Sequence, residues 1–415
     1  MASFLGFTNS KDEGQEGVEK AYEEWLNGAP ERVSVVRDAA RKAIETLGLI
    51  ERGEAGKTLQ LSLDRRLQFL AYRSLSQAVK KFDAASGTVV VLDSDRSEIL
   101  AMVSLPSFNP NDPAQRKGGA LRNRAVTDVL EPGSTMKPFT IAAALESGVV
   151  DSNTKIDTAP GRLRIGRSTI SEYQGHNYGE VDMAKLIQKS SNVGSAKVAL
   201  MMEPKDFWRV LDLIGLGEET GSTFPGESVG VLRDYARWRK IEQATLSYGY
   251  GMSMTPLQLA RAYSALAEDG VIRPVTFLYQ PEGVEHTEGR RVVSSKTAHS
   301  VRKMMEKVTQ PGGTAKLARV KEYGVAGKTG TVYKLVGGRY KDSDGKPFGH
   351  VALFAGFAPV NDPKIVVVVI VDDPKGKRYT GGAVAAPVFS EVMSGALRVM
   401  GIAPEGRAEE GDGHG

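Results

Sequence analysis

Residues 131–139 read EPGSTMKPF, in which Ser134 stands three places ahead of Lys137, directly after a Pro-Gly turn. The pattern fits a surface turn, and it also fits a serine nucleophile beside its own base. Spacing alone does not decide between the two, because Ser-x-x-Lys begins at three other serines: Ser152, Ser300 and Ser343. The residues that surround the first copy have to decide.

The composition indicates a globular protein with a mild charge. Of the 415 residues, 41% are hydrophobic and 25% are charged, and the net charge is +4. No basic block interleaves with aromatic residues, so nucleic acid is not an expected partner. The absence of cysteine excludes thiol catalysis, disulfides and thiolate metal sites, and the five histidines show no metal-ligand spacing. We therefore predict no metal and no cofactor.

No stretch of the sequence is long enough to cross a bilayer. The longest apolar run, Ile365–Val371, is seven residues long, whereas a spanning helix needs about 20. A β-branched run of this length predicts a buried strand. The first residues, MASFLGF, lack the basic and apolar regions of a signal peptide. The chain is expected to be soluble as written.

Hydrophobic periodicity divides the chain into three parts. Residues 1–57 are mostly charged, with short helix patterns at 18–26 and 36–49, and form an appendage. Residues 58–402 carry the main domain, and the polar, glycine-rich stretch 403–415 is expected to be a disordered tail.

The main domain begins and ends with strand patterns and has helices between them. A hairpin is predicted at 86–104, and further strands at 323–334, 350–360 and 364–373. Helices are predicted at 64–81, 134–147, 183–201, 255–268 and 384–400. The late strands are joined by connections too short for a helical crossover, so the sheet is expected to be antiparallel. The fold class is therefore α/β, an antiparallel sheet flanked by helices with a large helical subdomain.

Three short motifs follow one another in a fixed order: Ser134-x-x-Lys137, Ser190-Ser191-Asn192 and Lys328-Thr329-Gly330-Thr331. Lys-Thr-Gly occurs once in the chain, and a second Ser-x-Asn at Ser107 precedes the serine-lysine pair and so breaks the order. This ordered set is found in penicillin-binding proteins and class A β-lactamases, although there the middle element is Ser-Asp-Asn.

The chemistry explains why these residue types are needed. A serine hydroxyl is a weak nucleophile until a base takes its proton, and Lys137 lies one helical turn after Ser134. A lysine is a base only when neutral, and burial beside a second cation such as Lys328 lowers its pKa. Ser190 can relay a proton and Asn192 can bind a substrate amide. A glycine in the last motif, Gly330, lets a substrate backbone lie close to the strand edge.

Longer segments surround the motifs: RNRAVTDVLEPGSTMKPF, QKSSNVG, WRKIEQATLSYGYGMSMTPLQLARAYSALAEDG, PGGTA with VAGKTGT, and GFAPVNDPKIVVVVIVDDP. They resemble class B penicillin-binding proteins, most closely the division-specific transpeptidases of Gram-negative bacteria. The likeness runs from about residue 59 to 400. GFTNSKDEGQEGVEKAYEEWL resembles the end of that family's non-catalytic pedestal, so 1–57 is expected to be a pedestal remnant.

The resemblance implies a penicillin-binding, serine β-lactamase-like fold and a role for each motif. Ser134 would be the acylated nucleophile and Lys137 its general base, with Ser190 and Asn192 as proton relay and substrate-amide ligand. The stretch Lys328–Thr331 would bind the substrate carboxylate through Lys328, Thr329 and Thr331. The backbone N–H groups of Ser134 and Thr331 would form the oxyanion hole.

The same resemblance implies the substrate and the setting. The substrate would be a peptidoglycan stem peptide ending in D-Ala-D-Ala, and β-lactams would be covalent inhibitors. The family works at the periplasmic face of the inner membrane, with an N-terminal anchor and a longer pedestal that this sequence lacks. A septal glycan polymerase and other division proteins are the expected partners.

Two alternatives stay open from the sequence. A serine β-lactamase or D,D-carboxypeptidase would pass the acyl group to water, and no feature of the sequence identifies a deacylating glutamate. A β-lactam-sensing domain would keep the same three motifs but would need an attached transducer, and none is visible.

Overall fold

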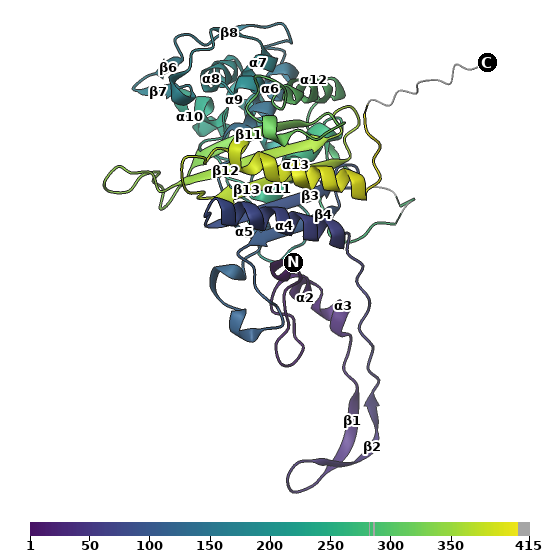
Figure 1. Cartoon of the computed structure of the whole chain (residues 1–415). Coiled ribbons are helices and arrows are strands. Elements are labelled where there is room, and N and C mark those ends of the chain that lie inside the picture. Colours follow the sequence, from purple (N-terminus) through teal and green to yellow (C-terminus); the bar gives the residue numbers. More distant parts are fainter. Residues whose placement is uncertain (282, 285–286, 406–415) are drawn as a thin grey trace, which may run out of the picture.

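A five-stranded antiparallel sheet in the order β11-β12-β13-β3-β4 lies at the centre of the molecule (Figure 1). The computed structural model describes residues 1–281, 283–284 and 287–405. The strands are β3 (Ser86–Asp93), β4 (Ile99–Leu105), β11 (Ala326–Tyr333), β12 (His350–Ala358) and β13 (Ile365–Asp372). Every neighbouring pair is antiparallel, which confirms the predicted sheet.

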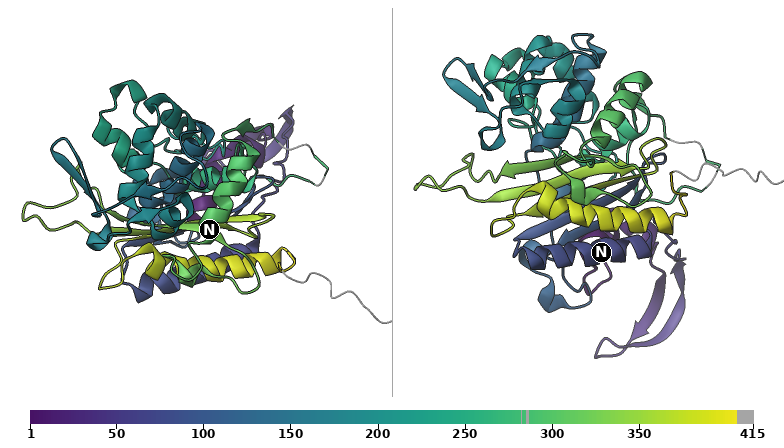
Figure 2. Two further views of the ribbon diagram at one scale, coloured as in Figure 1. Left: turned by 90° about the horizontal axis from the view of Figure 1, so that it is seen from above. Right: turned by 45° about the horizontal axis from the view of Figure 1, so that its top comes forward.

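Helices cover both faces of this sheet (Figure 2). Helices α4 (Arg65–Lys81) and α13 (Gly381–Val399) pack on one face, and α11 (Pro256–Ala267) packs on the other. Because both faces are covered, residues 365–371 of β13 are all buried, which explains their unbroken apolar run. The predicted helices at 64–81, 255–268 and 384–400 are confirmed.

The helical subdomain stands on the α11 side of the sheet, beside the edge strand β11 (Figure 1). Its helices are α6 (Lys137–Glu146), α7 (Met183–Lys189), α8 (Asn192–Met201), α9 (Pro204–Leu213), α10 (Lys240–Leu246) and α12 (Ser295–Glu306).

The single helix predicted over 183–201 is wrong. The chain leaves α7 at Ser190, which has the left-handed conformation φ 59°, ψ 43°. It re-enters a helix after Ser191, whose hydroxyl accepts a hydrogen bond from the Gly194 N–H at 2.8 Å. Serine is a strong N-cap because its hydroxyl satisfies a free amide of the first turn. Two serines in sequence therefore allow a break that apolar periodicity does not reveal.

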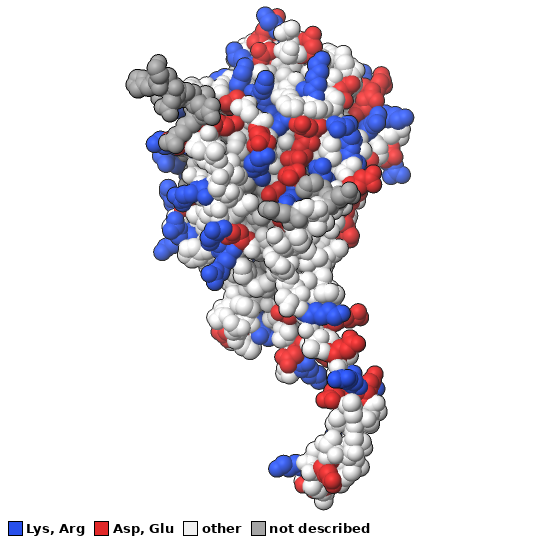
Figure 3. All heavy atoms as spheres, turned by 90° about the vertical axis from the view of Figure 1, so that its right-hand side faces the viewer, with Lys and Arg blue, Asp and Glu red and all other residues white. Residues whose placement is uncertain are grey.

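The helix predicted over 36–49 is also wrong. Strands β1 (Arg32–Arg37) and β2 (Ala43–Glu51) form a hairpin there. The Asp38 carboxylate accepts hydrogen bonds from the N–H groups of Ala40 and Lys42 and closes the turn. These side-chain bonds replace the backbone hydrogen bonds that a helix would need. The β-branched residues on either side suit the strands. On the face seen in Figure 3 the outer part of the hairpin shows few charged side chains, and Ile44 and Ile50 are 67% and 71% exposed.

The start of the chain shares the main core. The predicted helix at 18–26 is two short helices, α2 (Gly17–Ala21) and α3 (Glu23–Asn27). Phe4 and Val18 are buried, and the ring centroids of Phe4 and Phe277 lie 5.5 Å apart. The appendage has no core of its own and depends on the main domain for burial.

The other short elements connect these layers. The helices are α1 (Ala2–Leu5) and α5 (Arg124–Thr127), and the strands are β5 (Ile156–Asp157), β6 (Arg162–Ile165), β7 (Ser168–Ser171), β8 (Glu180–Val181), β9 (Val271–Ile272) and β10 (Arg290–Arg291). The single 3₁₀ turns are η1 (Pro113–Gln115), η2 (Gly118–Ala120), η3 (Gly133–Met136), η4 (Tyr173–Gly175), η5 (Tyr235–Arg237) and η6 (Lys316–Ala318).

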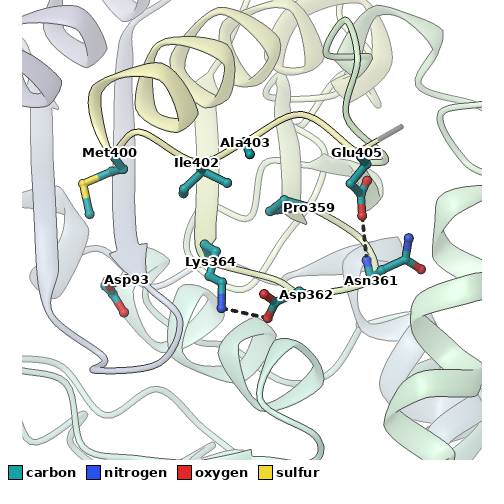
Figure 4. A pocket seen from close by; sticks show the side chains of 9 residues that line it. All are labelled: Asp93, Pro359, Asn361, Asp362, Lys364, Met400, Ile402, Ala403 and Glu405. Atoms are coloured by element: carbon teal, nitrogen blue, oxygen red, sulfur yellow. Dashed lines mark hydrogen bonds and ion pairs between the residues drawn. The ribbon is translucent and has the colours of Figure 1, made fainter. Parts of the chain in front are cut away.

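The C-terminal segment after α13 is fixed at Glu405, whose carboxylate accepts from the Gly324 N–H. It also accepts from the Asn361 N–H, as Figure 4 shows. A cavity of about 510 Å³ lies between this segment and the ends of β3 and β13. Lys364 and Asp362 form an ion pair at its floor, 2.8 Å apart. Of the predicted tail, 406–415 lies outside the described residues. Within those described, no helix could cross a membrane and no cluster of metal ligands occurs.

Candidate active site

Ser134 lies on the turn η3, which leads directly into α6. The Thr135 hydroxyl donates to the Pro132 carbonyl at 2.7 Å, and the buried Tyr263 hydroxyl of α11 donates to the Thr135 carbonyl at 2.8 Å. Thr135 and Met136 are buried, whereas Ser134 is half-buried. These two hydrogen bonds therefore fix the buried side of the turn, and the Ser134 side chain is left accessible.

A close approach to strand β11 requires a glycine just before Ser134. Gly133 has φ +56°, and a Cβ there would stand 2.2 Å from Cγ1 of Val332. Both its conformation and its contact exclude a side chain. The Pro-Gly pair thus lets the turn with Ser134 rest against the sheet edge.

Lys137 is completely buried at the start of α6. Its amine donates to the Ser190 carbonyl at 2.6 Å, to the Ser190 hydroxyl at 3.1 Å and to Oδ1 of Asn192 at 2.7 Å. The sequence predicted the amine beside the Ser134 hydroxyl, but no hydrogen bond joins these two groups within the described chain. The amine lies instead against the break between α7 and α8, because that break offers it three acceptors.

Lys328 of β11 reaches the same break from the sheet. It is completely buried, and its amine donates to the Ser190 hydroxyl at 2.8 Å and to the Thr329 carbonyl at 3.1 Å. The Ser190 hydroxyl therefore accepts from two lysine amines. A hydroxyl has two acceptor lone pairs and one proton to donate, so the Ser190 proton stays available for a third partner.

Burial shifts both lysines toward their neutral form. It lowers the pKa of Lys137 to about 7, although the charge of Glu172 opposes the shift. Burial, and then the neighbouring Lys137 charge, hold the pKa of Lys328 well below its usual range. An amine with a pKa near 7 is partly neutral at neutral pH and can accept a proton.

The rest of the third motif forms the sheet edge beside η3. The Thr329 hydroxyl lies 2.9 Å from that of Thr314, and the Thr331 hydroxyl accepts from the Gly381 N–H at 3.0 Å. A Cβ on Gly330 would stand 3.1 Å from Cγ2 of Thr135 and 3.2 Å from the Pro132 carbonyl. Sequence analysis predicted that Gly330 lets a substrate backbone lie close to the strand. The same glycine also lets β11 pack on the turn that carries Ser134.

The structure thus brings all eight predicted residues to one place, where β11 meets the starts of α6 and α8. The three other Ser-x-x-Lys pairs differ in one respect: their lysines, Lys155, Lys303 and Lys346, are exposed. The burial that makes Lys137 a candidate base is therefore absent at these three lysines.

Two carboxylates beside these residues were not identified by sequence analysis. Glu172 is buried, and its carboxylate accepts from the N–H groups of Asn192 and Val193. Glu131 accepts from the Gly251 N–H and from the Tyr340 hydroxyl, both at 2.8 Å, so it ties the long β11–β12 connection to the turn before Ser134. Neither belongs to a recognised spacing, although Glu131 stands three residues ahead of Ser134.

Comparison with known proteins agrees with this geometry. The family model described as "Penicillin binding protein transpeptidase domain" matches residues 87–394 of this chain. A protein of Neisseria flavescens named "Probable peptidoglycan D,D-transpeptidase PenA" is 44% identical over 95% of this chain and 96% of its own length. The peptidoglycan D,D-transpeptidase FtsI of Escherichia coli K12 is 40% identical over 97% of this chain and 66% of its own length.

A solved structure gives the same result in three dimensions. The apo transpeptidase domain of Burkholderia pseudomallei penicillin-binding protein 3 superposes with a TM-score of 0.75 at 41% identity. The match covers 83% of this chain and 98% of that domain. The resemblance seen in the sequence and the predicted fold are both confirmed. This chain belongs to the penicillin-binding protein transpeptidase family.

Proposed function

We propose that this protein is a peptidoglycan D,D-transpeptidase of the division-specific type, which cross-links stem peptides through an acyl-enzyme on Ser134. One observation carries the proposal: two buried lysine amines share the Ser190 hydroxyl beside the turn that presents Ser134. The likeness to relatives named peptidoglycan D,D-transpeptidase supports the same activity.

In the proposed acylation, the Ser134 oxygen attacks the carbonyl between the last two D-alanines, and its proton passes to neutral Lys137. The backbone N–H groups of Ser134 and Thr331 stabilise the oxyanion. The Ser190 hydroxyl then gives its proton to the departing D-alanine nitrogen and regains one from a neighbouring lysine. The C–N bond breaks, and an ester on Ser134 remains. An amine from another strand then attacks this ester, releases Ser134 and forms the cross-link.

The persistence of a penicillin adduct tests this function against the β-lactamase alternative. After the β-lactam ring opens on Ser134, the rest of the drug stays attached and blocks the place where an amine or water must stand. Hydrolysis then needs a dedicated carboxylate to orient a water. Both oxygens of nearby Glu172 already accept hydrogen bonds from Ser191, Asn192 and Val193.

We therefore expect intact-protein mass spectrometry to show one penicillin added per chain, with the adduct persisting for many minutes at neutral pH. Steady hydrolysis of penicillin at about one per second or faster, the range of ordinary enzymes, would assign the chain to the β-lactamases instead. Release of D-alanine from a donor peptide, together with a product joined to an added acceptor amine, would separate transpeptidation from carboxypeptidation.

Carboxylate recognition by Lys328, Thr329 and Thr331 gives a second prediction. Stem peptides and penicillins share a free carboxylate, and this strand edge offers the Lys328 amine and two hydroxyls. A bound carboxylate favours the ammonium form of Lys328. Esterifying the carboxylate should slow acylation of the intact protein about 100-fold, the cost of losing a charge-assisted hydrogen bond pair. In Thr329→Val the acid and the ester should differ much less, as measured by the rate of acylation with each. Equal penalties in both proteins would place the carboxylate elsewhere.

The setting is proposed from the family alone. The domain works at the periplasmic face of the bacterial inner membrane, with a septal glycan polymerase and other division proteins as partners. Residues 58–402 form the transpeptidase domain, in keeping with the family match at 87–394, and 1–57 belong to the pedestal. Co-purification of the polymerase with the protein, lost when the largely exposed hairpin β1–β2 is deleted, would support a partner-binding role for the pedestal.

A further inference from the structure

We propose that Glu172 is a positioning residue of the active site, which holds Ser190 and Asn192 in place against Lys137. The inference rests on the proposed function of Ser134 and extends it to a residue outside the three motifs. Glu172 follows β7 and comes 18 places before Ser190, so sequence spacing gives no reason to join the two.

The carboxylate of Glu172 uses both of its oxygens at the start of α8. One accepts from the Asn192 N–H at 2.7 Å. The other accepts from the Val193 N–H at 3.3 Å and from the Ser191 hydroxyl, which forms a short hydrogen bond. Glu172 is only 3% exposed, so these bonds lie away from competing water. A carboxylate that accepts backbone N–H groups at a helix start is bound by charge-assisted bonds and by the helix dipole.

These bonds act on the part of the chain that the chemistry uses. Ser190 holds a left-handed conformation that residues with a side chain rarely adopt. Its neighbours Ser191 and Asn192 are bound to Glu172 on the far side of the break. The Asn192 amide also donates to the Ser171 carbonyl at 3.1 Å, beside Glu172 in sequence. The segment 171–172 therefore fixes both the backbone and the side chain that face the Lys137 amine.

The charge of Glu172 has a second effect on the same lysine. Two titratable groups lie near the Lys137 amine: Glu172, from the start of η4, acts on the pKa of Lys137, whereas Lys328 of β11 has its own pKa lowered by the Lys137 charge. Ser190 and Asn192 supply its neutral neighbours. Because an anion favours the ammonium form, Glu172 keeps the pKa of Lys137 from falling further under burial. Burial and the Glu172 charge also raise the pKa of Tyr178, a separate reporter of that charge.

The test compares Glu172→Gln with Glu172→Asp. Gln keeps the shape but loses the charge, and its amide nitrogen cannot accept the N–H groups at the start of α8. Asp keeps the charge on a shorter stem. The second-order rate constant for acylation by a fluorescent penicillin is measured from pH 5.5 to 9. Glu180→Gln, which removes an exposed carboxylate of β8, serves as the matched control.

In Glu172→Gln we expect complete but slow labelling, about 10- to 100-fold slower than the parent at its best pH, since a small misplacement of catalytic groups costs this much. The inflection of the acid limb should move down by about one pH unit, because the anion beside Lys137 is gone. In Glu172→Asp the inflection should stay near that of the parent. In Glu180→Gln both rate and inflection should match the parent.

A merely structural role for Glu172 predicts a different outcome. Thermal melting would then fall while the folded protein reacted at the parent rate with the parent inflection, and that result would overturn the proposal. Failure of the proposed function looks different again, because the parent protein itself would not be labelled, or would be labelled at a residue other than Ser134.

Discussion

Ser134→Ala should gain no mass on exposure to a penicillin, whereas the parent protein gains one intact inhibitor. The expected loss is complete because the serine oxygen itself forms the covalent bond, and no other residue can replace it. Ser134 is half-buried on the surface of η3, so removing its hydroxyl leaves little cavity. The melting temperature should therefore change by no more than about 2 °C, as for other small surface changes.

The three other serines of the Ser-x-x-Lys pattern are the controls. Alanine at Ser152, Ser300 or Ser343 should leave both the rate and the extent of labelling unchanged, because the lysines of these pairs are exposed. Peptide mapping of the adduct should place it on the peptide that contains 131–139. An adduct on Ser134→Ala at the same stoichiometry would show that the nucleophile lies elsewhere.

Lys137→Ala should slow acylation by about 1,000-fold, within the range of general-base catalysis. The reason is that Lys137 must take the proton of Ser134, which requires the neutral amine. Burial lowers the pKa of Lys137 to about 7, so in the parent protein the acylation rate should rise with pH through this value. Below pH 7 the amine is mostly protonated and the reaction should slow about tenfold per pH unit.

Lys137→Met is the matched variant, because methionine fills most of the buried space without a titratable group. It should be as slow as Lys137→Ala, and the inflection near pH 7 should disappear from its pH profile. The comparison is made with a fluorescent penicillin over pH 5.5 to 9. A parent rate that does not change between pH 6 and 8 would contradict the assignment of Lys137 as the base.

Much of the fold could be predicted from local pattern. The apolar run of β13 and the hairpin β3–β4 were visible as strands, because strands buried on both faces are apolar throughout. Helix α11 was equally clear, since Thr255 caps it through the Gln258 N–H at 3.1 Å. The hairpin β1–β2 was not, because the apolar residues of β2 are exposed and do not face a core. Its conformation depends on one turn closed by Asp38.

The candidate catalytic residues could also be named from the sequence, and their roles stay predictions. Three motifs in one order, with flanking segments of a known family, were sufficient to name Ser134 and its partners. Chemical type makes this naming possible, because a nucleophile, a base and a carboxylate ligand each require particular side chains.

What the sequence could not determine is how these side chains meet. Lys137 and Lys328 are 191 residues apart, yet both donate to the hydroxyl of Ser190. This meeting depends on the left-handed break at Ser190, where apolar periodicity predicted an unbroken helix. Glu172, which binds the far side of that break, had no motif at all. Local sequence pattern indicates which residues are buried in a core and which cap a helix. The lowered pKa of Lys137 arises from burial of its amine. Only the packing of α6, α8 and β11 against one another creates that burial.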